Sequence, residues 1–179
     1  MENILNNLYS RFFLRDFLGY ILSGSILEYY FIQAYAKAEC KNAVELFDYT
    51  LTMIFVFVFI GYLVGICISS FCNSIEKLIK KIKYGSIENS DIRLLIILSQ
   101  DENWISQRDR FVSLKEITSK NGISILISFL IGISFDLDLP RLVLIIPIII
   151  LLREWYYYIV RQEEFEQSIE EKTKEVLNT

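Results

Sequence analysis

Glu28 has the most unusual chemical setting in the sequence, because it lies near the centre of the apolar stretch Phe17–Ala36. A charge in the middle of a bilayer costs about 2.5 kcal/mol or more, so such residues face a protein interior or a water-filled passage. Gly24 and Ser25 lie one helical turn before Glu28, on nearly the same face. This small, polar stripe predicts the lining of an ion passage, and the alternative is a carboxyl group that only joins helices by hydrogen bonds.

Other chemistry is limited by what the sequence lacks. The chain has no histidine, which excludes Ser–His and Cys–His catalytic pairs and zinc sites built on histidine. It also lacks the glycine-rich loops G-x-x-x-x-G-K-[ST] and G-x-G-x-x-G that bind phosphates, and its three cysteines have no disulfide or metal spacing. Asp136 and Asp138 could bind a hard cation, although a solvated turn is the simpler interpretation. We therefore expect no enzyme activity, no metal site and no cofactor.

The apolar residues are gathered into blocks, which predicts helices that cross a membrane. Hydrophobic residues make up 53% of the chain and its mean hydropathy is +0.37, whereas soluble domains are about 45 to 50% apolar. Leu51–Cys72 has no charged residue and is long enough to cross a hydrocarbon core of about 30 Å as a helix. Phe17–Ala36 reaches a similar length and also spans if Glu28 faces protein or water.

Two later blocks are shorter than the roughly 20 residues that a helix needs to span a bilayer. They are Gly122–Phe135 and Leu142–Leu152. The second can extend from Leu139 to Val160 if Arg153 snorkels to the interface, with Pro147 as a kink. Four spans are therefore our first interpretation, and a re-entrant hairpin formed by these two blocks is the rival one.

The distribution of basic residues favours four spans with both termini in the cytoplasm. In that topology, Lys37, Lys41 and Arg141 are the only ones of the 18 lysines and arginines on the outer side, as the positive-inside rule predicts for a protein of the bacterial inner membrane. The fold class is then an all-α polytopic membrane protein with a small cytoplasmic helical portion. Its parts are a lead-in and two spans in residues 1–72, a cytoplasmic helical region in 73–121, two spans in 122–161 and an acidic helical tail in 162–179.

A glycine pattern in the second span predicts close helix packing. Gly61 and Gly65 form a G-x-x-x-G motif, which lets two helix backbones approach within one chain or between chains. Four helices enclose little interior space, so a single copy has little room to shelter Glu28. We therefore expect a homo-oligomer in the lipid bilayer.

A basic segment follows the second span. Its lysines alternate with apolar residues at helical spacing, so the span is expected to continue as an amphipathic helix. The lysines are Lys77, Lys80, Lys81 and Lys83, and the apolar residues are Ile75, Leu78, Ile79 and Ile82. Such a helix anchors on anionic lipid, or it binds an anionic ligand such as a nucleotide or nucleic acid. The sequence leaves both interpretations open.

The acidic tail that begins at Gln162 carries Phe165, Ile169 and Val176 at helical spacing. A lone solvated helix of this length is only marginally stable, so the stripe needs a partner. We expect a helix that continues from the fourth span and pairs with the basic segment or with the tail of another copy.

The start of the first span also resembles a known group of proteins. Asp16-Phe-Leu-Gly-Tyr-Ile-Leu-Ser-Gly24 is similar to the D-[YF]-L-x-Y-[LI]-[LI]-P-G opening of small bacterial membrane effectors of anti-phage defence operons, among them the Hailong-type membrane effector, with Ser23 in place of the usual proline. Arg108 and Arg110 are similar to arginines that such proteins carry near the third span. The resemblance implies an oligomeric channel whose opening depolarises the cell, under control of a nucleotide or nucleic-acid signal made by a partner nucleotidyltransferase. It also implies that the four lysines of the basic segment bind this signal.

Three functions are compatible with these patterns. The first is an oligomeric ion-conducting effector of the inner membrane. The second is a non-conducting membrane adaptor that anchors a cytosolic partner through residues 73–121 or the acidic tail. The third is a small proton-coupled transporter that uses Glu28 as the proton carrier, and the sequence shows no inverted repeat in its support.

Overall fold

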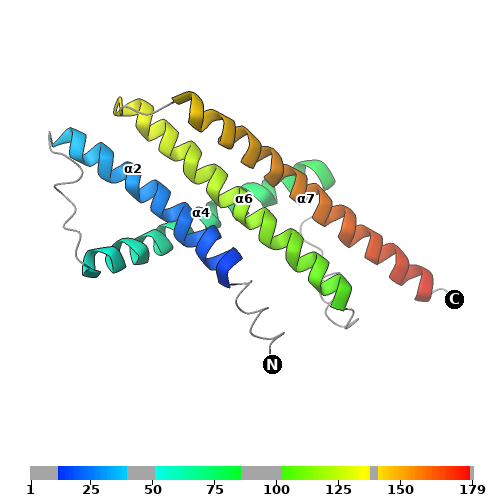
Figure 1. Cartoon of the computed structure of the whole chain (residues 1–179). Coiled ribbons are helices and arrows are strands. Elements are labelled where there is room, and N and C mark those ends of the chain that lie inside the picture. The colour runs from blue at the N-terminus through cyan, green and yellow to red at the C-terminus, as the bar shows by residue number, and fades with distance from the viewer. Residues whose placement is uncertain (1–11, 40–50, 86–101, 138–140, 178–179) are drawn as a thin grey trace.

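A computed structural model of the chain shows a bundle of helices (Figure 1). It describes residues 12–39, 51–85, 102–137 and 141–177. The elements in chain order are η1 (Phe12–Ile21), α2 (Leu22–Ala38), α4 (Leu51–Tyr84), α6 (Glu102–Ser134) and α7 (Arg141–Leu177). η1 is a π-helix that passes directly into α2, so the two form one continuous rod. No strand occurs in these residues, which confirms the predicted all-α fold for the part of the chain that they cover.

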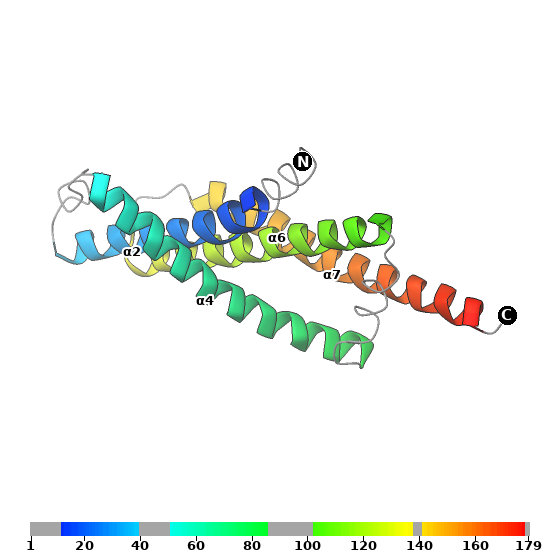
Figure 2. The same cartoon turned by 90° about the horizontal axis from the view of Figure 1, so that it is seen from below.

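Successive helices run in opposite directions. η1 and α2 run parallel to α6, whereas α4 and α7 run the other way (Figure 1, Figure 2). The start of η1, the end of α4, the start of α6 and the end of α7 therefore share one end of the bundle, which we call the terminal end (Figure 2). α4 crosses the other helices obliquely in Figure 1, and its last turns stand apart from α6 in Figure 2.

Two of the described helices are long and apolar enough to cross a membrane. They are α4, Leu51–Tyr84, and nearly all of α6, Asn103–Ser134. Protein covers only 17% of the most apolar part of α4, compared with 50% in α6. The core helix of a soluble protein is largely covered, so the bare apolar surface of α4 suits lipid. These two helices suggest membrane association, in agreement with the sequence.

The long helices pass through the borders that the sequence suggests between membrane and cytoplasmic parts. α4 continues through the basic segment to Tyr84, as expected. α6 joins the residues before Gly122 to the predicted third span, and α7 joins the predicted fourth span to the acidic tail, with Pro147 inside the helix. The borders at 121/122 and 161/162 are thus changes of polarity along continuous helices. The predicted lead-in before Phe12, Lys41, Asp138 and the side chains of Asp16, Arg141 and Val176 lie outside the described residues.

The main core lies where four helices meet. Its buried members come from α2, α4, α6 and α7, so it holds together helices that are far apart in the sequence. They are Leu27, Ile68, Cys72, Ile123, Trp155 and Ile159.

A second, smaller cluster fixes the acidic tail to the start of α6. Ile169 is buried, and Trp104, Ile105 and Phe165 pack against it. The rings of Phe165 and Phe111 also meet edge to face, with centroids 5.8 Å apart. The apolar stripe of the tail therefore pairs with α6 of the same chain. This apolar contact with α6 was not predicted. The expected pairing of the tail with the basic segment occurs through the ion pair between Glu163 and Lys80, and pairing with the tail of another copy stays a prediction.

Candidate functional site

The rod of η1 and α2 meets α4 through glycines. A Cβ atom added to Gly61 would lie 2.5 Å from the Oγ atom of Ser25. One added to Gly24 would collide with the carbonyl oxygen of Gly61, and one added to Gly65 would collide with that of Tyr20. The backbones thus approach as closely as the G-x-x-x-G motif predicts, and the contact lies within one chain.

This contact changes the interpretation of the polar stripe on the first span. Gly24 is buried against the backbone of α4, and Ser25 is half-buried beside Gly61. Gly24 presents no free surface to a passage, because α4 of the same chain covers it, whereas Ser25 keeps part of its surface exposed. Of the three predicted lining residues, only Glu28 keeps a side chain that is not committed to this helix contact.

Glu28 is half-buried, and its Oε2 atom is enclosed without a hydrogen-bond partner among the described residues. α4 runs antiparallel to α2, and Ser25 lies beside Gly61, so Glu28 is level with Phe57 and Val58, about one turn along α4. Both of these residues are apolar. On the side of α4, Glu28 is therefore level with apolar residues, and its Oε2 atom has no hydrogen-bond partner among the described residues.

A seam of small polar side chains joins η1 and α2 to α6. The Nδ2 atom of Asn121 donates to the carbonyl oxygen of Leu18 at 3.0 Å and to that of Ile117 at 2.9 Å. Further along, the Oγ atom of Ser124 donates to the carbonyl oxygen of Ser23. Ser128 is wholly buried one turn later, and its Oγ atom has no partner in the described residues. This seam was not predicted from the sequence, although the spacing of three and four residues from Asn121 to Ser128 marks one helical face.

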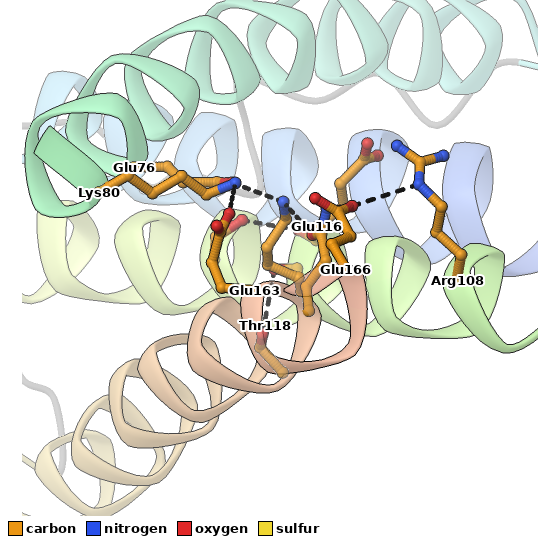
Figure 3. Close-up of polar contacts among 10 residues, drawn as sticks. Glu76, Lys80, Arg108, Glu116, Thr118, Glu163 and Glu166 are labelled. Carbon is orange, nitrogen blue, oxygen red and sulfur yellow. Dashed lines mark hydrogen bonds and ion pairs between the residues drawn. The ribbon is translucent and has the colours of Figure 1, made fainter. Parts of the chain in front are cut away.

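A cluster of charged side chains joins α4, α6 and α7 toward the terminal end. Figure 3 shows Lys80 of α4 and Glu163 of α7 pointing toward each other, with Glu76 beside them. The Nζ atom of Lys80 lies 2.5 Å from a carboxylate oxygen of Glu163 and 3.3 Å from one of Glu76. Glu76 also binds Lys115 of α6, with 2.6 Å between the charged atoms.

The same cluster continues along α7. Lys115 donates to the Oε1 atom of Gln162 at 2.8 Å, and the Nε2 atom of Gln162 donates to Glu166 at 2.8 Å. Glu166 accepts a further hydrogen bond from the Nε atom of Arg108 at 3.3 Å (Figure 3). Three cations thus face three carboxylates, so the cluster is formally neutral. We call it the interhelix charge cluster, and its members are Glu76, Lys80, Arg108, Lys115, Gln162, Glu163 and Glu166.

Lys120 is a buried cation that sequence reasoning also missed. Only 1% of its surface is exposed, and its Nζ atom lies 2.9 Å from a carboxylate oxygen of Glu116 and 3.6 Å from the centre of the Tyr20 ring. A carboxylate and an aromatic face are the partners that make a buried ammonium group tolerable. The spacing of four residues between Glu116 and Lys120 was the signal available in the sequence.

The four lysines of the basic segment do not form one site. Lys80 is committed to Glu163 and Glu76. Lys83 lies over the rings of Tyr84 and Tyr156, about 5 Å from each centre. Lys77 and Lys81 are exposed, and no ion pair to either occurs among the described residues. Only these last two share a surface that an anionic partner can reach without breaking a contact.

The turn after α6 places Asp136 beside the end of α2. Asp136 adopts a positive φ of 48°, and its carbonyl oxygen accepts a hydrogen bond from the Nζ atom of Lys37. In the ranges that the structure describes, no group of three Cys, Asp or Glu side chains is arranged to hold a metal ion. The contact of Lys37 instead closes the α2 end against the turn after α6.

Comparisons with known proteins give no relative. No protein-family model, curated protein or solved structure matches the chain.

Proposed function

We propose that the protein assembles from several copies into an ion-conducting effector of the bacterial inner membrane and has no enzyme activity. Glu28 carries the proposal, because its enclosed Oε2 atom lacks a partner in the described part of its own chain. A buried carboxylate without a partner is strongly unfavourable, whereas one that faces water in a passage, or a donor on another copy, is tolerated. The exposed part of the half-buried Glu28 side chain can face such an environment, and in this proposal neighbouring copies supply it.

Bare apolar surfaces support the insertion of four helices into the membrane. From Leu51 to Ile60, every side chain of α4 except Phe57 is exposed. Soluble proteins rarely leave continuous apolar surface of this extent uncovered. α7 also exposes Ile146, Ile149 and Ile150. The rod of η1 and α2 is long enough as well, because it exceeds the roughly 20 residues of a span.

The surroundings of Glu28 suit a contact between copies. Phe31 and Tyr35 follow it along α2, and more than half of each side chain is exposed. Large aromatic side chains are enriched at protein interfaces, since they bury much area at a small entropy cost. When α2 of each copy faces a common axis, the Glu28 carboxylates form a ring, and such a ring favours cations over anions.

The effector role is supported by the resemblance of Asp16–Gly24 to membrane effectors of anti-phage defence. In this role, opening of the assembly depolarises the infected cell. A nucleotide or nucleic-acid signal made by a partner nucleotidyltransferase controls the opening. Lys80 is not available for such a signal unless its ion pairs with Glu163 and Glu76 break.

Ion leak from liposomes tests the proposal. Glu28→Gln removes the charge and keeps the size of the side chain, so it should lower the cation leak and the preference for cations over chloride. The mass of the detergent-extracted assembly should stay the same. Glu164→Gln is a matched control, because Glu164 is exposed in the tail and its one ion pair among the described residues is with Arg161.

Two outcomes would contradict conduction through Glu28. One is an unchanged leak and ion preference in Glu28→Gln. The other is wild-type protein that stays monomeric and does not leak. If such non-conducting protein also retains a cytosolic partner through residues 73–121 or the acidic tail, the adaptor function replaces the channel function.

A further inference from the structure

The part of α4 after Cys72 has an inner face that is bound to the bundle. We call residues 73–84 the basic arm. Ile79 packs against the main core, and Lys80 binds Glu163 of α7. Both Ile79 and Lys80 thus have partners within the chain. The inner face therefore leaves no surface for a further ligand.

The outer face of the basic arm is different, because it joins large apolar side chains to unpaired cations. Leu78 is 58% exposed and Ile82 is 77% exposed. Lys77 and Lys81 are exposed beside them, and no ion pair to either occurs in the described residues. Residues at positions i, i+1, i+4 and i+5 lie on one side of a helix. One face thus offers two ammonium groups and two apolar side chains to a single partner.

This face continues the bare surface of the membrane part of α4. Phe71 is exposed and lies two turns before Leu78, hence on the same side of the helix. An upright helix would carry Leu78 about 9 Å and Ile82 about 15 Å beyond Cys72, whereas the headgroup layer is about 5 to 8 Å thick. α4 is inclined to the other helices (Figure 1, Figure 2), and an inclination to the membrane normal would shorten both distances. Lysine stems also reach back several ångströms toward the headgroups.

We propose that the basic arm docks on the membrane surface, where Lys77 and Lys81 bind the phosphate groups of anionic phospholipids and Leu78 and Ile82 enter the upper part of the acyl chains. This inference rests on the membrane insertion in the proposed function, but not on ion conduction. A phospholipid matches both halves of the surface. A soluble nucleotide would neutralise the lysines but would leave the two apolar side chains in water.

Native mass spectrometry of the purified full-length protein measures the binding of single lipids. The probes are phosphatidylglycerol, which is anionic, and phosphatidylcholine, which is zwitterionic. Wild-type protein should prefer phosphatidylglycerol. Each basic residue near an anionic surface contributes about fivefold, so Lys77→Gln/Lys81→Gln should reduce this preference about 25-fold.

Two further double variants separate the contributions. Leu78→Ser/Ile82→Ser should weaken the binding of both lipids and leave their ratio unchanged, because it removes apolar contact and keeps the charge. Arg110→Gln/Arg161→Gln is the matched control, since it removes two exposed cations from α6 and α7. It should leave the preference for phosphatidylglycerol in place.

Three results would overturn the inference. The first is no preference for phosphatidylglycerol in the wild-type protein. The second is an equal loss in the control variant, which would show a general charge effect. The third is binding of adenosine triphosphate that depends on Lys77 and Lys81 while lipid binding does not. Wild-type protein that leaks ions but shows no preference for phosphatidylglycerol would refute only the lipid site. Wild-type protein that prefers phosphatidylglycerol but does not leak would refute only the channel.

Discussion

The ion pair between Lys80 and Glu163 should stabilise the contact between α4 and α7, and its contribution can be estimated from burial. The two side chains are 14% and 17% exposed, and 2.5 Å separates their charged atoms. Exposed pairs contribute about 0.2 to 1 kcal/mol, whereas removal of one partner from a fully buried pair costs about 3 to 5 kcal/mol. For intermediate burial we expect a coupling free energy of about 1.5 kcal/mol.

A double-mutant cycle measures this coupling. The variants are Lys80→Met, Glu163→Gln and the combination, and the observable is the free energy of unfolding in mixed detergent micelles. Lys80→Met should cost about 2 to 3 kcal/mol, because it leaves the carboxylate of Glu163 without its cation and removes one of the two cations that bind Glu76. The double variant should cost about 1.5 kcal/mol less than the sum of the single changes.

Arg161 and Glu164 form the matched control pair. They lie 3.1 Å apart on α7, but their side chains are 52% and 55% exposed. Their coupling should be smaller and should vanish in high salt, because water and ions screen exposed charges. A Lys80–Glu163 coupling no larger than that of this control would refute the reasoning from burial. It would also refute the role of the interhelix charge cluster in holding α4.

Three further predictions concern packing, and unfolding free energies in the same micelles check them. Gly61→Ala should cost about 1 to 3 kcal/mol, since the added Cβ atom would lie 2.5 Å from the hydroxyl oxygen of Ser25. Gly122→Ala should cost less, because the added Cβ atom would meet leucine side chains at 3.2 Å. Equal costs would contradict the close contact at Gly61. Ser124→Ala should cost about 1 kcal/mol, because it loses a buried hydrogen bond. Ser128→Ala should be neutral or stabilising, because its Oγ atom has no partner among the described residues. The reverse order would contradict the seam. Ile169→Ala should cost about 2 to 5 kcal/mol and release the tail from α6. Faster proteolysis of the tail would show this release, and an unchanged rate of proteolysis would contradict the packing.

The features that sequence could predict are those that a single helix determines. α4 is apolar without interruption from Leu51 to Cys72, and its continuation to Tyr84 follows from helical spacing within one segment. The close approach at Gly61 and Gly65 also follows from one helix, since small residues one turn apart leave a flat surface. None of these properties requires knowledge of which helix is the neighbour.

The features that sequence could not predict depend on a partner distant in the chain. Gly24 looked like part of a polar lining, but its role follows from Gly61 of α4, which no pattern in the first span reveals. Lys115 looked like one more cytoplasmic cation, yet it is buried because Glu76, 39 positions away, neutralises it. The count of basic residues predicts on which side of a membrane a segment lies, but it does not predict which lysine or arginine is buried between helices.

Cross-linking at position 28 in the bilayer tests the shared passage most directly. Glu28→Cys is made in a chain whose three native cysteines are replaced by serine, and membranes are treated with an oxidant or with bismaleimides of increasing length. Ser128→Cys is the matched control, because Ser128 is wholly buried in the seam within one chain. We predict covalent oligomers from position 28 and none from position 128. Monomers alone from position 28, at every linker length, would contradict a passage lined by Glu28 of several copies.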